Sequence, residues 1–271
     1  MKQSGYGSIK RGRGLAWARL WRARLDVDAT VEVELGGELT AEETARAERF
    51  ARPEDRRRFV VARGVLRMLL GSILGENPRS IPIDAGPSGK PRLADAEHGV
   101  FFNVSHSRDE ALVCIAGGGE VGVDLEAVRP VRSAVAIARQ RFASAETSFI
   151  EAGATTGEVN RRFLLCWTRK EALAKAVGAG LSFDLRRIGV PLAAAGGLVS
   201  IGDREGTPSS QRWLLVNVPL GAEHVATLAL PASALAGNAP AAPEPERTTE
   251  MAPAHCEEID MGPLISRVLD S

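Results

Sequence analysis

Cysteine is scarce in this chain of 271 residues, and the sequence places Cys114, Cys166 and Cys256 far apart. Three scattered cysteines argue against a disulfide framework and fit a reducing cytoplasm. Long apolar runs are also absent, since no stretch approaches the length of about 20 apolar residues that a membrane-spanning helix needs. We therefore expect a soluble cytoplasmic protein with no membrane partner.

Net charge is lacking too, because 34 Lys and Arg residues balance 34 Asp and Glu residues. Without a global field there is no electrostatic reason to expect nucleic acid or an anionic membrane as a partner. The basic opening segment, MKQSGYGSIKRGRG, precedes a stretch that arginines interrupt, which makes a poor signal-peptide core. The length allows one large or two small domains with a buried core.

Signals for helices and strands occur twice in the same order. In the first half, Thr40 and Glu43 form a T-x-x-E capping box that predicts a short helix. Pro53 suits the first turn of a long helix that ends near Leu74. Three strand-like runs follow, and their close spacing predicts an antiparallel meander over residues 100–105, 111–116 and 121–126.

The second half repeats this order. Ser144 is the predicted N-cap of a short helix, and a long helix is predicted over residues 158–177. Strands are predicted after it, near residues 186–190, 198–202, 212–218 and 224–230.

The repetition predicts an α+β fold of two pseudo-symmetric halves, each a helix pair packed on a small antiparallel sheet. We expect the halves to comprise residues 15–130 and 131–235. The Pro- and Ala-rich residues 236–271 are predicted to form a disordered tail.

The segment EVGVDLEAV carries two carboxylates on one face of a predicted strand. Apolar residues alternate with Gly122, Asp124 and Glu126, so the two acids lie about 6.6 Å apart at roughly 3.3 Å per residue. A solvated acidic face is the plain interpretation, but Gly122 leaves the same face open beside the acids. Carboxylate pairs without His or Cys partners favour hard cations such as Mg²⁺ over zinc.

The predicted helix CWTRKEALAKAVGAGL places Trp167, Glu171 and Lys175 on one face, with Lys170 beside them. A surface Glu–Lys pair worth a few tenths of a kcal/mol is the alternative interpretation. A tryptophan on the charged face and the glycine break that begins at Gly178 favour a helix packed against a site.

Basic residues on a loop and on the first long helix are candidates for binding phosphate. The loop GPSGKP supplies Lys90, and the helical segment RRRFVVAR supplies Arg63. Arg and Lys suit phosphate oxygens, although they suit solvent equally well.

In the segment FNVSHS, His106 has three interpretations: a catalytic base, a phosphate ligand or a polar residue that closes a strand. Its neighbours Ser105 and Ser107 are open to a simpler interpretation as caps of the next turn.

Together, FNVSHS, GVDLE and WTRKEALAKAVGAGL resemble the 4′-phosphopantetheinyl transferases of the Sfp type in order and spacing, and GPSGKP is similar to that family's loop. The resemblance covers about residues 15–232. It implies two similar α+β halves with coenzyme A in the cleft between them. It also implies the reaction: the phosphopantetheine arm of coenzyme A moves to a serine of an acyl or peptidyl carrier protein domain, and adenosine 3′,5′-bisphosphate is released.

The resemblance implies that Asp124, Glu126 and Glu171 hold Mg²⁺, which neutralises charge on the diphosphate. Glu171 would take the proton of the serine hydroxyl, directly or through a metal-bound water. Lys175 would stabilise or protonate the leaving phosphate. Because two halves in one chain build the cleft, we expect a monomer.

The same resemblance assigns contacts with coenzyme A. Arg63 and Lys90 would hold its 3′-phosphate and adenine end, with Ser105 beside them. His106 would be a phosphate ligand rather than a base. The other residues assigned to coenzyme A are Gly89, Asn103, Lys170 and Lys175.

Two other functions use the same residues. A module that binds coenzyme A or a carrier protein without catalysis has no physical need for the complete set Asp124, Glu126, Glu171 and Lys175. A metal-dependent hydrolase of phosphate esters would use the same carboxylates with water as the nucleophile.

Overall fold

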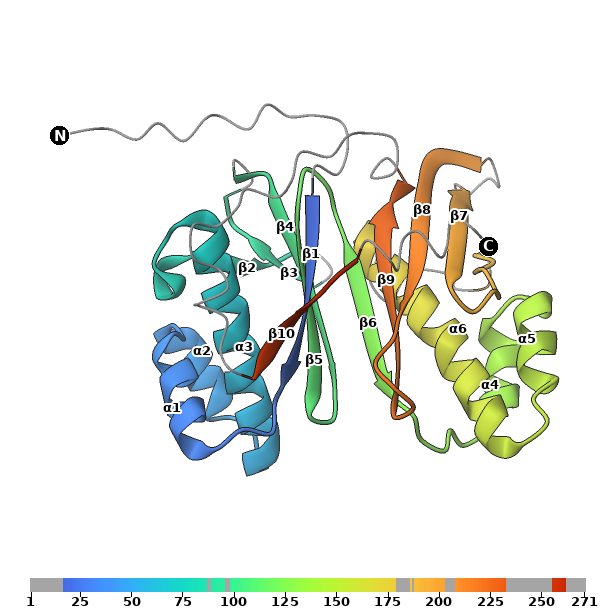
Figure 1. Ribbon diagram of the computed structural model, residues 1–271, viewed down its shortest axis with the longest axis horizontal. Helices are drawn as coiled ribbons and strands as arrows, with labels where there is room; N and C mark the ends of the chain where they lie inside the picture. The colour runs from blue at the N-terminus through green and yellow to red at the C-terminus, as the bar shows by residue number, and fades with distance from the viewer. Residues whose placement is uncertain are drawn as a thin grey trace.

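The computed structural model describes residues 17–86, 89–95, 98–178, 186, 188–202, 208–232 and 255–261. Two four-stranded antiparallel sheets lie between two groups of helices (Figure 1). The first sheet has the order β10-β1-β5-β4, with bounds β1 Trp17–Arg24, β4 Val100–Ser107, β5 Glu110–Gly117 and β10 Cys256–Ile259. The second has the order β6-β9-β8-β7, with bounds β6 Gly122–Ala127, β7 Gly196–Gly202, β8 Pro208–Val218 and β9 His224–Pro231.

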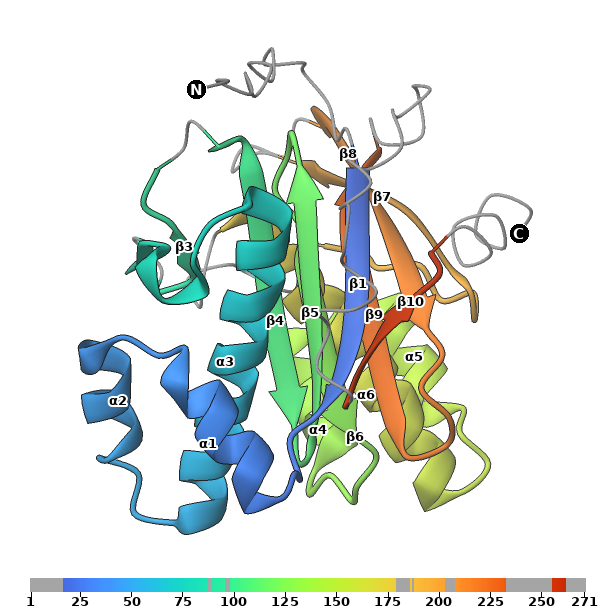
Figure 2. The same cartoon turned by 60° about the vertical axis from the view of Figure 1, so that its left-hand side comes forward.

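Helices cover the outer side of each sheet, as the turned view also shows (Figure 2). The first sheet is flanked by α1 Ala29–Gly37, α2 Ala41–Ala47 and α3 Pro53–Leu74. The second is flanked by α4 Ala134–Arg141, α5 Ser144–Glu151 and α6 Thr156–Val177. A separate pair of short strands, β2 Ile83–Ala85 and β3 Pro91–Leu93, precedes β4.

Each sheet is buried on both faces. In β5, Val113 and Cys114 point to opposite sides because strand side chains alternate. Val113 packs in the cluster that includes Val65 of α3, whereas Cys114 belongs to the core between the sheets with Leu228 of β9. Leu173 of α6 packs on the outer face of the second sheet. The predicted α+β fold of two halves is confirmed.

The helix signals predicted at Thr40 and Pro53 are present, whereas the predicted N-cap Ser144 is wrong by one residue, because Ala143 is the N-cap of α5. Thr40 Oγ1 accepts a hydrogen bond from the Glu43 amide at 3.3 Å, and Glu43 Oε2 accepts one from the Thr40 amide at 3.0 Å. Pro53 begins α3, and Gly75 ends it in the left-handed conformation with φ of 70°.

The predicted meander is wrong at its third strand. β4 and β5 pair with each other, but β6 pairs with β9 of the second sheet. Strand β6 therefore belongs with the C-terminal strands, although the expected boundary at residue 130 placed it in the N-terminal half. The apolar side chains of Val121, Val123 and Leu125 fill the core between the sheets, and chain spacing alone does not distinguish which sheet receives such a strand.

The strand predicted near 186–190 is also wrong, since none of its described residues, 186 and 188–190, is in a strand. Side chains bind the backbone there instead. Lys170 Nζ donates to the Ile188 carbonyl at 2.6 Å, and the Val190 amide donates to Glu146 Oε1 at 2.8 Å.

Disorder was predicted for a segment that contains β10. Cys256–Ile259 pair antiparallel with β1, and Glu258 forms an ion pair with Arg19. The prediction is wrong for these residues, and residues 236–254 and 262–271 lie outside the described ones. Within the described part of the chain, no helix has both the length and the apolar character needed to cross a membrane.

Candidate active site

Strand β6 and helix α6 bring the predicted acidic residues together. Glycine at position 122 permits this contact, because a Cβ there would lie 2.0 Å from the Ala172 carbonyl oxygen and 2.6 Å from the Ala176 amide nitrogen. The helix backbone fills the space that was expected to be open, which corrects the interpretation of Gly122. Asp124 and Glu126 share the face of β6 that Gly122 presents to α6.

Lys175 extends from α6 to both β6 and β4. Its Nζ donates to Asp124 Oδ1 at 2.7 Å and to the Val123 carbonyl at 3.1 Å. It also donates to Ser105 Oγ at 3.1 Å, and that hydroxyl donates to Asp124 Oδ1 at 3.0 Å. Asp124, Lys175 and Ser105 thus form one connected polar group at the junction of the two halves.

The charge of Asp124 perturbs the other two carboxylates of the site. Burial raises the pKa of Asp124, and the ammonium of Lys175 opposes that rise. Burial and then the charge of Asp124 raise the pKa of Glu126 and also that of Glu171. Repelling carboxylates in a partly buried place favour the binding of a cation.

Across the described ranges, no group of three or more His, Cys, Asp or Glu residues is arranged to hold a metal ion as it stands. Two features nevertheless fit a hard divalent cation. Asp124 Oδ2 is buried and has no hydrogen-bond partner, and the nearby donors are carboxylate oxygens of the kind that Mg²⁺ prefers. One oxygen of Asp124 is therefore unused by the protein.

Side chains of β4 bind the outer edge of β6. The side chains of three alternate residues of β4 accept hydrogen bonds from the backbone amides of three alternate residues of β6. The pairs, with donor–acceptor distances, are Asn103–Val123 at 2.7 Å, Ser105–Leu125 at 3.2 Å and Ser107–Ala127 at 2.9 Å. We call these three pairs the polar ladder. Asn103 and Ser105 thus have partners inside the protein, and their contact with coenzyme A stays a prediction.

Lys90 also binds the segment that leads into β6. Its Nζ donates to Glu120 Oε2 at 2.6 Å and to the Val121 carbonyl at 3.0 Å. Gly89, just before it, has a φ of 79°, which only glycine adopts without strain. Lys90 and Arg92 line a pocket of about 210 Å³. The carboxylates of Asp95 and Glu120 line the same pocket and balance these two cations. The predicted phosphate contact of Lys90 stays a prediction.

His106 lies on the face of β4 opposite the polar ladder, because strand side chains alternate. The residue is exposed, yet partial desolvation by the surrounding protein, and then the charges of Lys175 and Arg58, lower its pKa. A neutral imidazole can donate one hydrogen bond to an anion, and the charges of Lys175 and Arg58 attract one. Its role as a phosphate ligand stays a prediction.

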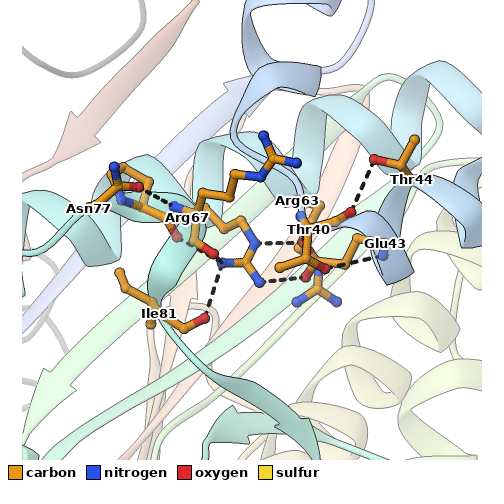
Figure 3. Close-up of polar contacts among 9 residues, drawn as sticks. Thr40, Glu43, Thr44, Arg63, Arg67, Asn77 and Ile81 are labelled. Carbon is orange, nitrogen blue, oxygen red and sulfur yellow. Dashed lines mark hydrogen bonds and ion pairs between the residues drawn. The ribbon is translucent and has the colours of Figure 1, made fainter.

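Arg63 lies in a cluster around Glu43, between α2 and α3 (Figure 3). Glu43 accepts hydrogen bonds from Arg67 Nε at 2.6 Å and Nη2 at 3.0 Å, and Arg63 Nε is 3.5 Å from its Oε1. Arg67, which is 2% exposed, also donates to the carbonyls of Pro78 and Ile81. Desolvation lowers the pKa of Arg63, and its Nη1 is buried without a partner. The contact of Arg63 with the 3′-phosphate stays a prediction.

Lys170 is a correction to the predicted site. Its side chain is completely buried, and Nζ lies 2.8 Å from Oε2 of Glu146, which is 1% exposed. Trp167, interpreted as part of a charged face, instead packs on Phe142 and Phe163. Only Glu171 and Lys175 of this helix therefore remain at the site.

Sequence reasoning missed the contribution of Ser107 and assigned Asn103 to a ligand. The usable signal was their spacing, since residues 103, 105 and 107 are polar at alternate strand positions. A polar face on a strand within an apolar core needs hydrogen-bond partners. The sequence does not show that those partners are the amides of β6.

Family comparisons match both halves of the chain. Residues 120–229 match the family described as the 4′-phosphopantetheinyl transferase superfamily. Residues 33–119 match the family described as 4′-phosphopantetheinyl transferase, N-terminal. The two matches meet between β5 and β6, where the chain passes from the first sheet to the second.

Individual proteins carry the same description. The chain is 38% identical over 165 residues to the 4′-phosphopantetheinyl transferase HetI of Nostoc sp., and this alignment covers 60% of this chain and 69% of that protein. It is 29% identical over 235 residues to a phosphopantetheinyl transferase of Thraustochytrium sp., with 83% and 81% covered. It is also 29% identical over 154 residues to a 4′-phosphopantetheinyl transferase of Bacillus subtilis, with 57% and 66% covered.

Proposed function

The chain belongs to the 4′-phosphopantetheinyl transferase superfamily, and on this premise we propose that it moves phosphopantetheine from coenzyme A to a carrier-protein serine. The acceptor would be an acyl or peptidyl carrier protein domain, and the second product would be adenosine 3′,5′-bisphosphate. The observation that carries the proposal is the junction of β6 and α6. It gathers Asp124, Glu126, Glu171 and Lys175 inside the matched residues 120–229.

We propose that Asp124, Glu126 and Glu171 hold Mg²⁺ in the working enzyme. The unpartnered Oδ2 of Asp124 supports this assignment, as do the pKa values of the three carboxylates, which burial raises and which, for Glu126 and Glu171, the charge of Asp124 raises further. When bound, the cation supplies charge neutralisation on the diphosphate of coenzyme A.

Glu171 is the proposed acceptor of the serine proton. Burial and the charge of Asp124 raise its pKa, which brings a carboxylate closer to the basicity that general-base catalysis near neutral pH requires. The carboxylate of Glu171 has no hydrogen-bond partner among the contacts of the described residues, whereas that of Asp124 is bound by Lys175 and Ser105. Of these two carboxylates, that of Glu171 is therefore the one free to accept a proton.

Lys175 is the proposed partner of the leaving phosphate. Its ammonium lies 2.7 Å from Asp124 Oδ1, and its side chain is 28% exposed, so an incoming anion can reach it. As negative charge develops on the leaving phosphate, a fixed cation stabilises the transition state more than the ground state.

The adenine and 3′-phosphate end of coenzyme A is proposed to lie near the pocket that Lys90 and Arg92 line. Gly89 gives the loop its turn, and His106 and Arg63 are the further candidates for phosphate contact. Lys90 is paired with the exposed Glu120, so we propose that a phosphate would replace that carboxylate.

We propose a monomer that works in the cytoplasm. One chain supplies both β4 and β6 to the site, so no second subunit is needed.

The cysteines support the proposed cytoplasmic location, because all three are free. Burial raises the pKa of each to about 12, which makes them unreactive thiols.

The direct test is incubation with coenzyme A, Mg²⁺ and an apo carrier protein, followed by intact-mass measurement of the carrier. We expect a mass increase of one phosphopantetheine group per carrier, and none when the acceptor serine is replaced by Ala. The variant Asp124→Ala should not transfer. An unmodified carrier with coenzyme A consumed would indicate hydrolysis, and binding without either change would indicate an inactive module.

A further inference from the structure

Strand β6 is an edge strand whose outer side is bound by side chains. It pairs with β9 alone in its sheet, and alternate residues of an antiparallel strand direct their amides to opposite sides. The Val128 amide, just beyond β6, bonds to Glu223 O at 2.7 Å on the β9 side. The amides of Val123, Leu125 and Ala127 point the other way, where the polar ladder meets them.

Two carbonyls on this outer side also have side-chain partners. Lys90 donates to the Val121 carbonyl, and Lys175 donates to the Val123 carbonyl. Unpaired backbone groups at a buried edge are costly, and here side chains of β4, α6 and the Gly89 loop satisfy them. A ladder built from short side chains fixes the distance between β4 and β6 more tightly than apolar packing alone.

From this geometry we infer that Asn103 and Ser107 are positioning residues of the active site. This inference rests on the proposed function. Their side chains accept hydrogen bonds from the amides of Val123 and Ala127, and these two residues flank the stretch that carries Asp124 and Glu126. Asn103 and Ser107 act on these carboxylates through the β6 backbone and do not touch them.

Burial supports this role for the ladder. Asn103 is 4% exposed and Ser105 is 6% exposed, so solvent does not easily replace a bond lost at either residue, whereas Ser107 is only partly buried. The middle rung is shared, because Ser105 binds both the Leu125 amide and the Asp124 carboxylate. A small displacement of β6 would therefore move Asp124 relative to Glu171 and Lys175, which belong to α6. Displacements of about 1 Å in an active site can cost on the order of a hundredfold in rate.

The test compares Asn103→Ala, Ser107→Ala and the conservative variant Ser107→Thr, which keeps the hydroxyl. Asp28→Ala is the matched stability control, because Asp28 caps α1 by accepting from the Thr30 and Val31 amides, far from the ladder in sequence. Three experiments are carried out on each variant. Steady-state kinetics with an apo carrier gives kcat and KM for coenzyme A, calorimetry gives the Mn²⁺ affinity of the protein alone, and amide hydrogen exchange reports on β6.

We expect kcat to fall about tenfold or more in Asn103→Ala and several-fold in Ser107→Ala. KM for coenzyme A should stay nearly unchanged in Ser107→Ala, because Ser107 is not a candidate ligand of coenzyme A. Mn²⁺ binding should weaken by a similar factor, and the Val123 or Ala127 amide should exchange faster. Ser107→Thr should recover most of the loss, and Asp28→Ala should lower only the melting temperature.

The inference would be overturned if a variant kept the kinetic constants and Mn²⁺ affinity of wild type although its Val123 or Ala127 amide exchanged faster. A loss in Asp28→Ala equal to that in the ladder variants would also overturn it, because the effect would then be one of general stability. If the wild-type protein transfers nothing, the proposed function fails, and the Mn²⁺ affinities of the same variants still decide the role of the ladder.

Discussion

Two lysines on α6 have opposite environments although they lie only five positions apart. Lys170 is completely buried against Glu146, while the side chain of Lys175 is 28% exposed beside Asp124. Lys170 Nζ also lies 5.2 Å from the Phe142 ring centre. The resemblance implied that both lysines bind coenzyme A, and helical spacing alone does not reveal which side of a charged helix faces the core.

Replacing Lys170 by Ala tests this distinction. Removal of one partner leaves Glu146 buried without its cation, so the free energy of unfolding should fall by about 3–5 kcal/mol. KM for coenzyme A should stay unchanged at temperatures well below the melting point. Chemical denaturation and steady-state kinetics measure the two quantities, and a raised KM in a well-folded Lys170→Ala protein would restore the original assignment.

His106 offers a second test at the residue scale. If it donates to a phosphate of coenzyme A, His106→Ala should raise KM about ten- to a hundredfold, because a hydrogen bond to a charged group is worth roughly 1.5–3 kcal/mol. The value of kcat should change little. A fall in kcat at constant KM would instead make His106, and not Glu171, the acceptor of the serine proton.

Helix contacts at the element scale depend on buried charge as well as on apolar packing. Glu43 joins α2 to α3 through Arg67, and its carboxylate also caps α2 (Figure 3). Although burial acts to raise the pKa of Glu43, its hydrogen bond with Arg67 and the further contacts lower it below the ordinary value of 4.5. A carboxylate whose pKa is lower in the fold than in the unfolded chain stabilises the fold at pH values above its ordinary pKa. This contribution to the free energy of unfolding is lost as the pH falls through the folded pKa.

The variant Glu43→Gln should therefore lose about 3 kcal/mol of unfolding free energy at neutral pH. The difference from wild type should shrink as the pH falls below 4.5, because Glu43 then becomes neutral first in the unfolded chain and, at lower pH, in the folded protein too. Melting curves from pH 7 to pH 3 measure this. Glu42→Gln on the exposed side of α2 is the control and should follow wild type throughout, whereas a pH-independent loss in Glu43→Gln would contradict the linkage.

Caps, a proline and apolar periodicity predicted the helices, because the residues that determine a helix are close together in sequence. The capping box at Thr40, the proline at position 53 and the apolar periodicity of α3 and α6 all gave helices near their observed bounds. Strand β6 was predicted with the right residues but joined to the wrong sheet. Its place depends on pairing with β9, about 100 residues later in the chain, and on packing that no local pattern encodes.

The site was predictable to a similar extent. The sequence supplied Asp124, Glu126, Glu171 and Lys175, and the structure brings their charges together. It did not supply the partners of Asn103 or the burial of Lys170, because both depend on contacts between segments distant in sequence.

At the scale of the whole molecule, β10 connects the end of the chain to its beginning. Its pairing with β1 covers the outer edge of the first sheet, while Ile259 and Met261 pack against the core between the two sheets. Arg22 lies 3.6 Å from Glu257 and forms two 2.9 Å hydrogen bonds with Glu110 of β5. The strand thus protects an edge and closes one side of the core between the halves.

Two truncations isolate this contribution, one ending at residue 254 and one ending at Met261. They differ only by residues 255–261, which include β10. We expect the shorter protein to lose about 2–3 kcal/mol relative to the longer one through lost apolar burial and strand pairing. For a chain of this size, that loss lowers the melting temperature by roughly 5–10 °C. The exposed edge of β1 should also promote self-association, since an unpaired strand edge is a template for pairing. Calorimetry and light scattering at matched concentration measure both effects, and equal melting temperatures with equal scattering would show that β10 does not stabilise the fold.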